Sequence, residues 1–188
     1  MKETHYTYEP YSDYALENTK YEYSEELIRS KISNLAEALC EEKDSKAIGA
    51  LGETYASFKL IQKGWILLNR NWHSRFGELD IVMLTPDKIL VFIEVKTRRS
   101  TRCGIPLEAI TYKKRLKTRK TAMKWLQENG SQVRHCSTRF DAISITIPSK
   151  AIPSKAIPSK AIPSKNTNSD TQFSNEENIQ FKHIQGAF

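Results

Sequence analysis

The chain has 188 residues, and its 39% hydrophobic content suits one globular domain with additional segments but excludes an integral membrane protein. The start, MKETHYTYEP, lacks the apolar run of a secretory signal, and Cys40, Cys103 and Cys136 lack the spacing of a zinc site or a disulfide framework, so we expect a cytoplasmic protein with reduced cysteines. The net charge of +7 makes a polyanion such as nucleic acid the first partner to consider.

Charge is unevenly distributed along the chain. Residues 1–46 hold 6 basic and 11 acidic residues, whereas residues 47–147 hold 18 basic and 8 acidic residues. The rest of the chain holds 5 basic and 3 acidic residues. Because the excess of positive charge belongs to the middle of the chain, that region is where a polyanion is expected to bind.

Residues 1–46 are predicted to form an acidic, tyrosine-rich extension. Six of the eight tyrosines lie in the first 23 residues, with no helical or strand period, which predicts a flexible segment that could also dock on a partner. An amphipathic helix is predicted over residues 24–42, with Ser24 as its N-cap. Its apolar face comprises Ile28, Ile32, Leu35 and Leu39.

A second helix is predicted over residues 45–64, with Gly64 as its C-terminal stop. Gly49 and Gly52 lie inside it, and each costs about 1 kcal/mol relative to alanine in a helix interior. Their presence predicts that another element packs closely against this turn. The apolar side of the helix comprises Ile48, Leu51, Tyr55 and Phe58.

Three strands are predicted to follow the second helix. They span residues 65–72, 77–85 and 88–98. The sequence TPDK between the second and third strands is typical of a turn, so these two strands are predicted to form an antiparallel hairpin.

A long helix is predicted over residues 107–130, with Pro106 before it and Gly130 at its end. The alternating pattern at residues 139–147 predicts a fourth strand, and residues 178–188 can supply a short fifth. The inner stripe of the long helix is predicted to comprise Tyr112, Leu116, Met123 and Leu126.

Four copies of Ile-Pro-Ser-Lys recur at a five-residue period between the fourth and fifth strands. Proline every fifth residue prevents a helix and removes strand hydrogen-bond donors, and five residues are too few for a stacking structural unit. We therefore predict a flexible insertion at about residues 147–172.

The sequences GELD and IEVKT place charges inside predicted strands. Since residues two apart in a strand point to the same side, Glu94 and Lys96 share one face of their strand, and Glu78 and Asp80 share one face of the preceding strand. Neighbouring carboxylates with hard oxygen atoms suit Mg²⁺ or Mn²⁺, and a metal beside a lysine is the outline of a phosphodiester hydrolysis site. The alternative is a cross-strand salt bridge on a solvated sheet face.

Several of these sequences together resemble the YraN-like family of uncharacterised bacterial proteins. They are GETYASFKLIQKGWILLNRN, GELDIV, LVFIEVKTR, LEAITYKKRLKTRKTA, RFDAISI and the ending HIQGAF. That family is similar to Holliday junction resolvases and other nucleases of the PD-(D/E)XK fold. The resemblance covers residues 47–147 and about the last ten residues, and does not cover residues 1–46 or the repeats.

The resemblance implies an α/β fold of the restriction-endonuclease type, in which a mixed central sheet is flanked by helices. Residues 47–188 would form this nuclease-like domain, with the repeat insertion inside it. Carried over, the motif makes Asp80, Glu94, Lys96 and Glu53 the catalytic residues, of which the three acids would bind the metal. Taken alone, Glu53 fits an ordinary solvated helix residue better than a site residue, and Leu79 stands where the broader superfamily has proline.

The long helix carries seven cations within twelve residues and no acid between them. A helix face of a single charge sign suits phosphate backbones, whereas a face that only aids solubility usually mixes signs. Arg102 could extend this surface toward the metal, and Lys124 is the last cation of the run. The predicted nucleic-acid-binding residues are Arg98, Arg99, Lys113, Lys114, Arg115, Lys117, Arg119 and Lys120.

These patterns predict a magnesium-dependent endonuclease that acts on DNA in preference to RNA, with branched or structured substrates. A non-catalytic nucleic-acid-binding protein that keeps the fold is the alternative, and a protein-interaction module that uses the acidic start is a third. A homodimer is implied by analogy with resolvases. Asp141, in RFDAISI, either approaches the site from the fourth strand or has a structural role with Arg139.

Overall fold

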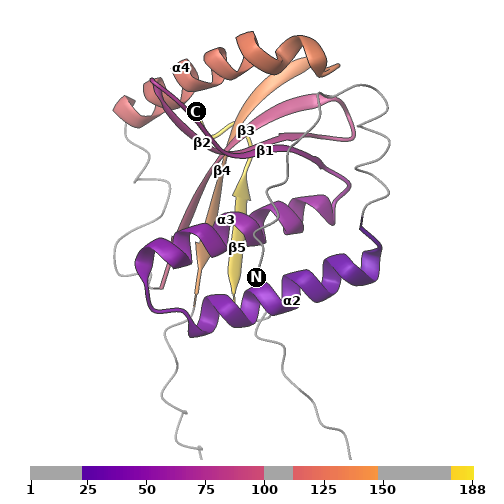
Figure 1. Ribbon diagram of the computed structural model, residues 1–188, viewed down its shortest axis with the longest axis vertical. Coiled ribbons are helices and arrows are strands. Elements are labelled where there is room, and N and C mark those ends of the chain that lie inside the picture. Colours follow the sequence, from indigo (N-terminus) through magenta and orange to yellow (C-terminus); the bar gives the residue numbers. More distant parts are fainter. Residues whose placement is uncertain (1–22, 100–111, 148–178) are drawn as a thin grey trace, which may run out of the picture.

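The computed structural model describes residues 23–99, 112–147 and 179–188. Figure 1 shows a central sheet with helix α4 on one face and helices α3 and α2 on the other. Helix bounds are Glu25–Glu41 for α2, Ser45–Ile61 for α3, Tyr112–Asn129 for α4 and Gly130–Gln132 for the 3₁₀ turn η2. Strand bounds are Ile66–Ser74 for β1, Gly77–Leu84 for β2, Ile89–Arg98 for β3, Ser137–Thr146 for β4 and Gln180–Ile184 for β5.

The five strands lie in the order β1-β2-β3-β4-β5. β3 and β4 are parallel, and every other neighbouring pair is antiparallel. The parallel pair follows from the connection through α4, because a parallel crossover needs a long connecting segment. The predicted mixed α/β architecture is therefore confirmed, with all five strands in one sheet.

Strand alternation separates two cores on the two faces of this sheet. Ile81 and Ile93 face α3 and α2 in one core, whereas Val82 and Phe92 face α4 in the other. Each core buries apolar side chains away from water, and this burial is the main favourable contribution to folding. Any residue of β3 that shares the side of Phe92 therefore faces α4.

Helices α2 and α3 form as predicted. The Ser24 hydroxyl accepts a hydrogen bond from the Leu27 N–H at 3.2 Å, and Asp44 caps α3 in the same way from the Ala47 N–H at 2.7 Å. Ile32 and Tyr55 are each only 1% exposed. Helix α2 packs on α3, so it shares the core on that face of the sheet.

The close contact predicted for the glycines of α3 is confirmed at Gly52 only. A Cβ atom there would lie 2.9 Å from the Thr97 Cβ of β3, whereas a Cβ at Gly49 would meet nothing within 4 Å. Helix α3 therefore approaches β3 closely at one point. Gly64, with φ of +80°, ends the helical segment as expected.

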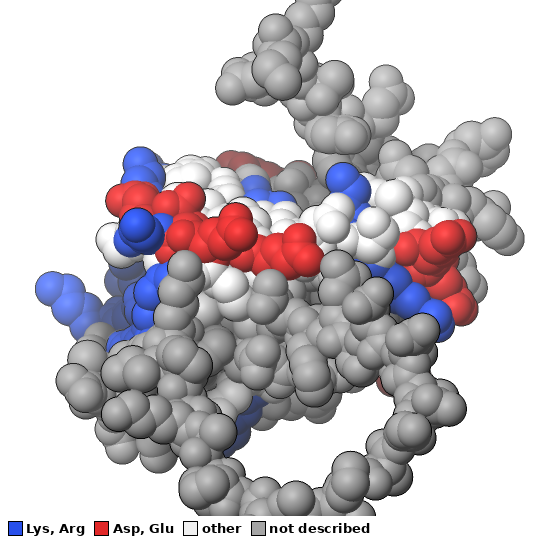
Figure 2. Space-filling view, turned by 90° about the horizontal axis from the view of Figure 1, so that it is seen from below, with Lys and Arg blue, Asp and Glu red and all other residues white. Residues whose placement is uncertain are grey.

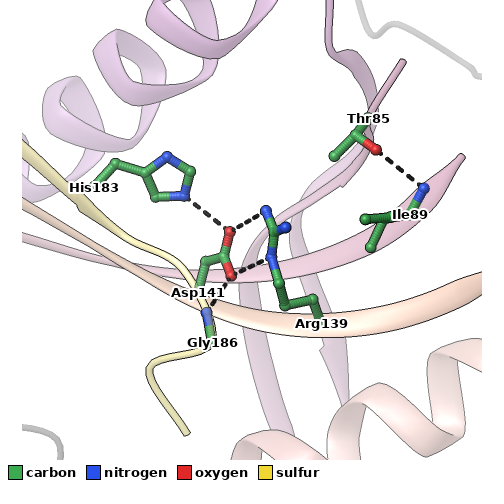
Figure 3. Close-up of polar contacts among 6 residues, drawn as sticks. All are labelled: Thr85, Ile89, Arg139, Asp141, His183 and Gly186. Carbon is green, nitrogen blue, oxygen red and sulfur yellow. Dashed lines mark hydrogen bonds and ion pairs between the residues drawn. The ribbon is translucent and has the colours of Figure 1, made fainter. Parts of the chain in front are cut away.

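The predicted β2–β3 hairpin is confirmed. The Thr85 N–H donates to the Ile89 carbonyl at 2.9 Å, and the Thr85 hydroxyl accepts from the Ile89 N–H at 3.0 Å (Figure 3). Lys88 adopts a left-handed conformation with φ of +60° to close the turn. The two acidic strand segments are thus held side by side.

The inner stripe predicted for the long helix is wrong at three of its four residues, whereas the fourth, Leu126, is partly buried against the core on that face. Tyr112, Leu116 and Met123 are 76%, 42% and 62% exposed. The buried face carries two threonines, which a hydropathy pattern counts as polar, but their hydroxyls donate to backbone carbonyls one turn earlier at 3.1 and 2.9 Å. The buried residues of α4 are Thr118, Thr121, Ala122 and Trp125.

Trp125 sets this rotation of α4. Its indole N–H donates to the Asn69 Oδ1 at 2.6 Å, and its ring meets Phe92 edge to face at 5.8 Å. A buried indole needs such a hydrogen-bond partner. Gly130 continues into η2 instead of ending the helix in a left-handed cap.

Three sets of predictions lie outside the described residues. They are the flexible tyrosine-rich start, the loop and helix start around Pro106, and the repeat insertion. The domain boundary at residue 46 stays a prediction. None of the helices within the described ranges is long and apolar enough to cross a membrane.

Candidate active site

The site begins where β2 and β3 stop pairing. Their ladder ends at Ile81 opposite Ile93, and the next position along each strand is Asp80 and Glu94. The Asp80 Oδ2 accepts the Val95 N–H at 2.8 Å. A carboxylate therefore takes the place of a backbone acceptor, which holds Asp80 beside Glu94 on the face that α4 covers.

Glu94 is only 6% exposed, and the cation that contacts it is Lys114. The Lys114 ammonium donates to the Glu94 Oε1 from the first turns of α4. Burial by itself lowers the pKa of Lys114, but the hydrogen bond and charge of Glu94 hold that pKa above its usual value. Helix α4 is thus tied to the acidic strands by an ion pair.

The surroundings of Asp80 raise the pKa of its carboxyl group. Burial, followed by the negative charge of Glu94, raises the pKa of Asp80 to about 7. The Val95 N–H and the charge of Lys114 lower this pKa, and Glu53 raises it further. The folded protein therefore holds the Asp80 carboxyl group beside Glu94 in surroundings that favour the protonated form of Asp80.

Glu53 joins these two residues from α3. Burial raises the pKa of Glu53, a hydrogen bond from Asn71 and the charge of Arg70 lower it, and the charges of Glu78 and Glu94 raise it. Its Oε2 is buried and has no hydrogen-bond partner among the described residues. A buried polar atom left unsatisfied is costly and marks a position where a ligand can be accommodated.

The acids are of the type that binds a divalent metal, but their side chains are not arranged as a preformed metal site. Their hard carboxylate oxygens and the unpartnered Glu53 Oε2 suit Mg²⁺ or Mn²⁺. Within the described ranges, however, no three acidic, histidine or cysteine side chains are grouped so that they could hold an ion. The Lys114 ammonium and the Val95 N–H instead take one oxygen each of Glu94 and Asp80.

The comparisons with known proteins cover this site. The model of Uncharacterised protein family UPF0102 matches residues 52–145, half of the chain. The chain belongs to this family. The UPF0102 match spans Glu53, Asp80, Glu94 and Lys114 but leaves out α2 and β5. The resemblance to the YraN-like family is thereby confirmed.

Individual UPF0102 relatives agree with the family match. A UPF0102 protein of Bifidobacterium longum subsp. infantis is 51% identical over 102 residues, which are 54% of this chain and 82% of the relative. One from Rhodococcus jostii is 44% identical over 102 residues, 54% of this chain and 83% of the relative. One from Trichlorobacter lovleyi is 39% identical over 105 residues, 56% of this chain and 81% of the relative.

Lys96 shares a face of β3 with Glu94, as strand alternation predicted, but it does not contact Glu94. Its side chain is exposed and forms no ion pair with any described residue. Sequence reasoning counted Lys114 as a phosphate ligand and missed its contact with Glu94. Arg70 was also missed, although burial lowers the pKa of its guanidinium and the charge of Glu53 opposes that shift.

The predicted phosphate-binding cations have different surroundings. The Arg99 guanidinium donates to the Leu39 carbonyl at 3.0 Å and to the Glu42 carbonyl, so it stabilises the C-terminal end of α2. Arg98, on β3, is partly buried. The Arg119 guanidinium lies 5.8 Å from the centre of the Phe140 ring. The exposed cations of α4 are Lys113, Arg115, Lys117, Arg119 and Lys120.

Lys117 packs its aliphatic chain over the start of β2. A Cβ atom at Gly77, which has φ of +143°, would lie 2.5 Å from the Lys117 Cε. Only glycine adopts this backbone conformation easily and leaves room for the lysine chain. Gly77 therefore lets α4 approach the strand that carries Asp80.

The acidic N-terminal helix lies on the opposite side of the sheet from α4. Figure 2 shows acidic side chains as a band along the face that α2 forms. Helix α2 therefore does not cover α4. The exposed acids of α2 are Glu25, Glu26, Glu37 and Glu41.

Asp141 has a structural role with Arg139. It is fully buried and accepts from the Arg139 Nε at 2.8 Å, the Arg139 Nη2 at 2.9 Å, the His183 Nε2 at 2.8 Å and the Gly186 N–H at 2.9 Å (Figure 3). Burial would raise the pKa of Asp141, but these donors hold it below its usual value. Asp141 thereby attaches the C-terminal strand to β4 on the face opposite Glu94.

Proposed function

We propose that this protein is a metal-dependent nuclease that hydrolyses phosphodiester bonds in DNA. The observation that carries the proposal is the contact between Lys114 of the basic helix and Glu94 of the acidic strand pair. A surface suited to phosphates is thus continuous with a group of under-satisfied carboxylates. In the same proposal the mixed sheet with flanking helices is a restriction-endonuclease-like fold, supported by the position of the acids on an antiparallel hairpin beside a parallel strand.

In this proposal Asp80, Glu94 and Glu53 would hold Mg²⁺ or Mn²⁺. A metal bound there supplies Lewis-acid stabilisation of charge that develops on a phosphate oxygen. The hydrogen bond from the Val95 N–H, which fixes the Asp80 carboxylate beside Glu94, supports this role. Lys96, exposed on the same side of β3, would orient the attacking water, and Lys114 would move from Glu94 to the phosphate.

The cations of α4 would hold the phosphate backbone beside this site. Each phosphate that they neutralise makes affinity depend steeply on salt. Branched DNA as the substrate and a homodimer as the active form rest on the similarity of the YraN-like family to resolvases.

The second candidate is a nucleic-acid-binding protein without catalysis. It is favoured by one observation, the ion pair that neutralises Glu94 without any metal. Under this alternative, Asp80, Glu94 and Lys114 form a buried network that fixes α4 on the sheet. Nucleic acid would bind α4 with no dependence on divalent metal.

The test is cleavage of labelled branched and linear DNA with Mg²⁺ or Mn²⁺. Wild-type protein should cleave, and Glu94→Ala and Asp80→Asn should lose at least 100-fold in rate because each removes a metal ligand. Glu37→Gln, which removes one exposed acid of α2, is the control and should cleave normally. Salt-sensitive binding with no cleavage would favour the second candidate. Cleavage that survives both site variants would show that a contaminating nuclease, and not this site, cuts the DNA.

A further inference from the structure

Helix α4 exposes apolar side chains among its cations. Tyr112, Leu116 and Met123 are among the most exposed large hydrophobic residues of the described chain, at 76%, 42% and 62%. Single exposed apolar residues are ordinary, but a contiguous exposed set marks an interaction surface. Together these three residues form a surface that we call the α4 ridge.

The α4 ridge is one stripe and not three scattered residues. At about 100° per residue, positions 112, 116 and 123 fall within about 40° of one another around the helix axis. The same count places the ridge opposite Thr121 and Trp125, which face the sheet. The ridge therefore points directly away from the protein core.

Cations border the α4 ridge on both sides. Lys113 and Lys120 lie on one side of it and Arg115 on the other, and all three are exposed. The ridge is thus an apolar strip with positive charge on both sides. A ligand that contacts both the ridge and its cations must present negative groups within a few ångströms of apolar surface.

This combination argues against two simpler partners. A second copy of α4 is disfavoured, because each copy carries seven cations and one acid on the helix. The backbone of a DNA duplex supplies phosphates but keeps the faces of its bases stacked inside. A strand with unstacked bases presents phosphates and apolar base faces together.

We propose that the α4 ridge binds unstacked bases of a single-stranded or branched nucleic acid while the bordering cations bind its phosphates. Tyr112 would stack on a base, and Leu116 and Met123 would pack against its neighbours. The inference rests on the proposed function only in taking nucleic acid as the ligand. On the same count Lys114, which contacts Glu94, lies on the side of α4 opposite the ridge, so the helix, ~10 Å across, separates a strand on the ridge from Glu94.

The experiment measures fluorescence anisotropy of a labelled single strand of 20 nucleotides and of the matching duplex, in EDTA, across a salt series. Wild-type protein should bind the single strand more tightly. The double variant Tyr112→Ala/Met123→Ala should lose about 10-fold to 100-fold of affinity for the single strand and little for the duplex, with an unchanged salt slope. Both residues are exposed, so circular dichroism should show an intact fold.

The matched control is Lys113→Gln/Lys120→Gln on the same helix. It should weaken both ligands and lower the salt slope by about 1.4 for the single strand, which is about 0.7 for each lost phosphate contact. Equal losses for single strand and duplex in the ridge variant, or no loss for either, would overturn the inference. The inference would also be overturned if the ridge variant lost binding to anionic phospholipid vesicles but bound the single strand as tightly as the wild type does.

Failure of the inference and failure of the proposed function give different results. Cleavage of DNA by a protein whose ridge variant keeps full single-strand affinity overturns the inference alone. Single-strand binding through the ridge without cleavage in Mg²⁺ or Mn²⁺ supports the inference and overturns catalysis. Absence of any nucleic acid binding by the wild-type protein overturns both.

Discussion

Asp141 and Asp80 are both enclosed aspartates of the same sheet, but their surroundings differ in kind. Asp141 accepts four hydrogen bonds, from Arg139, His183 and the Gly186 N–H, and its pKa is lowered. The Asp80 carboxylate accepts the Val95 N–H, lies beside Glu94, and has a pKa raised to about 7. A carboxylate with its donors complete is a structural anchor, whereas one kept short of donors is available to a cation.

The two sites also lie on opposite faces of the sheet. Asp141 is on the side of the core that contains α2 and α3, and Glu94 is on the side of α4. The face with Asp141 carries the acidic outer surface of α2, and the face with Asp80 and Glu94 carries the cations of α4. Positive charge is therefore concentrated on the face that carries Asp80 and Glu94.

The largest expected effect comes from breaking the satisfied site. Asp141→Ala leaves the partly buried Arg139 without its anion and the Gly186 N–H without an acceptor, and should lower the free energy of unfolding by about 3–5 kcal/mol. Urea denaturation measures this loss, and faster hydrogen exchange at the Gly186 amide would locate it. Glu37→Ala on exposed α2 is the control and should change stability by less than about 0.5 kcal/mol. A similar small change for Asp141→Ala would show that its hydrogen bonds contribute little.

An intermediate effect is expected from removing the cation that contacts Glu94. Lys114→Ala leaves Glu94 without its partner and should destabilise by about 1–2 kcal/mol, less than a fully buried pair because the Lys114 side chain is 40% exposed. Millimolar Mg²⁺ should restore more stability to this variant than to the wild type, since the metal can then replace the ammonium. Thermal unfolding with and without Mg²⁺ measures both effects.

Lys113→Ala, at the exposed neighbouring position, is the matched control for Lys114→Ala and should show neither effect. If Mg²⁺ stabilises all three proteins equally, Lys114 does not compete with a metal for Glu94. The acids would then be a fixed part of the fold, as Asp141 is.

An effect of the opposite sign, a gain in stability, is expected at Asp80. Because the folded-state pKa of about 7 exceeds the ordinary value of 3.8, the folded protein binds more protons than the unfolded chain between about pH 4 and pH 7. The contribution of Asp80 to stability is therefore full below about pH 4 and is lost as the pH rises through 7.

Asp80→Asn keeps an acceptor for the Val95 N–H but removes the repulsion with Glu94. It should stabilise the protein by about 1–2 kcal/mol at pH 8 and by less at pH 5. Melting temperatures at the two pH values measure this difference. A destabilised variant at pH 8 would mean that the Asp80 charge is satisfied in the folded protein, and the contrast with Asp141 would disappear.

The sequence predicted the elements well where apolar spacing is regular. Ser24 and Asp44 begin α2 and α3, and TPDK closes the hairpin. It failed on the inward face of α4, because Thr118 and Thr121 satisfy their hydroxyls within the helix and can be buried although they are polar. Their partners are backbone atoms, which no hydropathy pattern represents.

The candidate site was predictable in its acids but not in their relations. Strand alternation put Asp80 and Glu94 on neighbouring strands, and the hairpin register confirms that they lie at adjacent positions. The identity of the cation on Glu94 was not predictable. Lys96 is two residues away in sequence and Lys114 is twenty, and only the placement of α4 over β3 selects Lys114.

The sequence by itself determined the family, the order of the elements, the pairing of the acidic strands and the single charge sign of α4. These depend on local spacing and composition, which act over a few residues. Only the tertiary structure decided that Asp141 is a structural anchor, that Arg99 caps α2, and that the α4 ridge points outward. Those outcomes depend on donors, acceptors and rings that come together from distant parts of the chain, and their partners exist only once the sheet has formed.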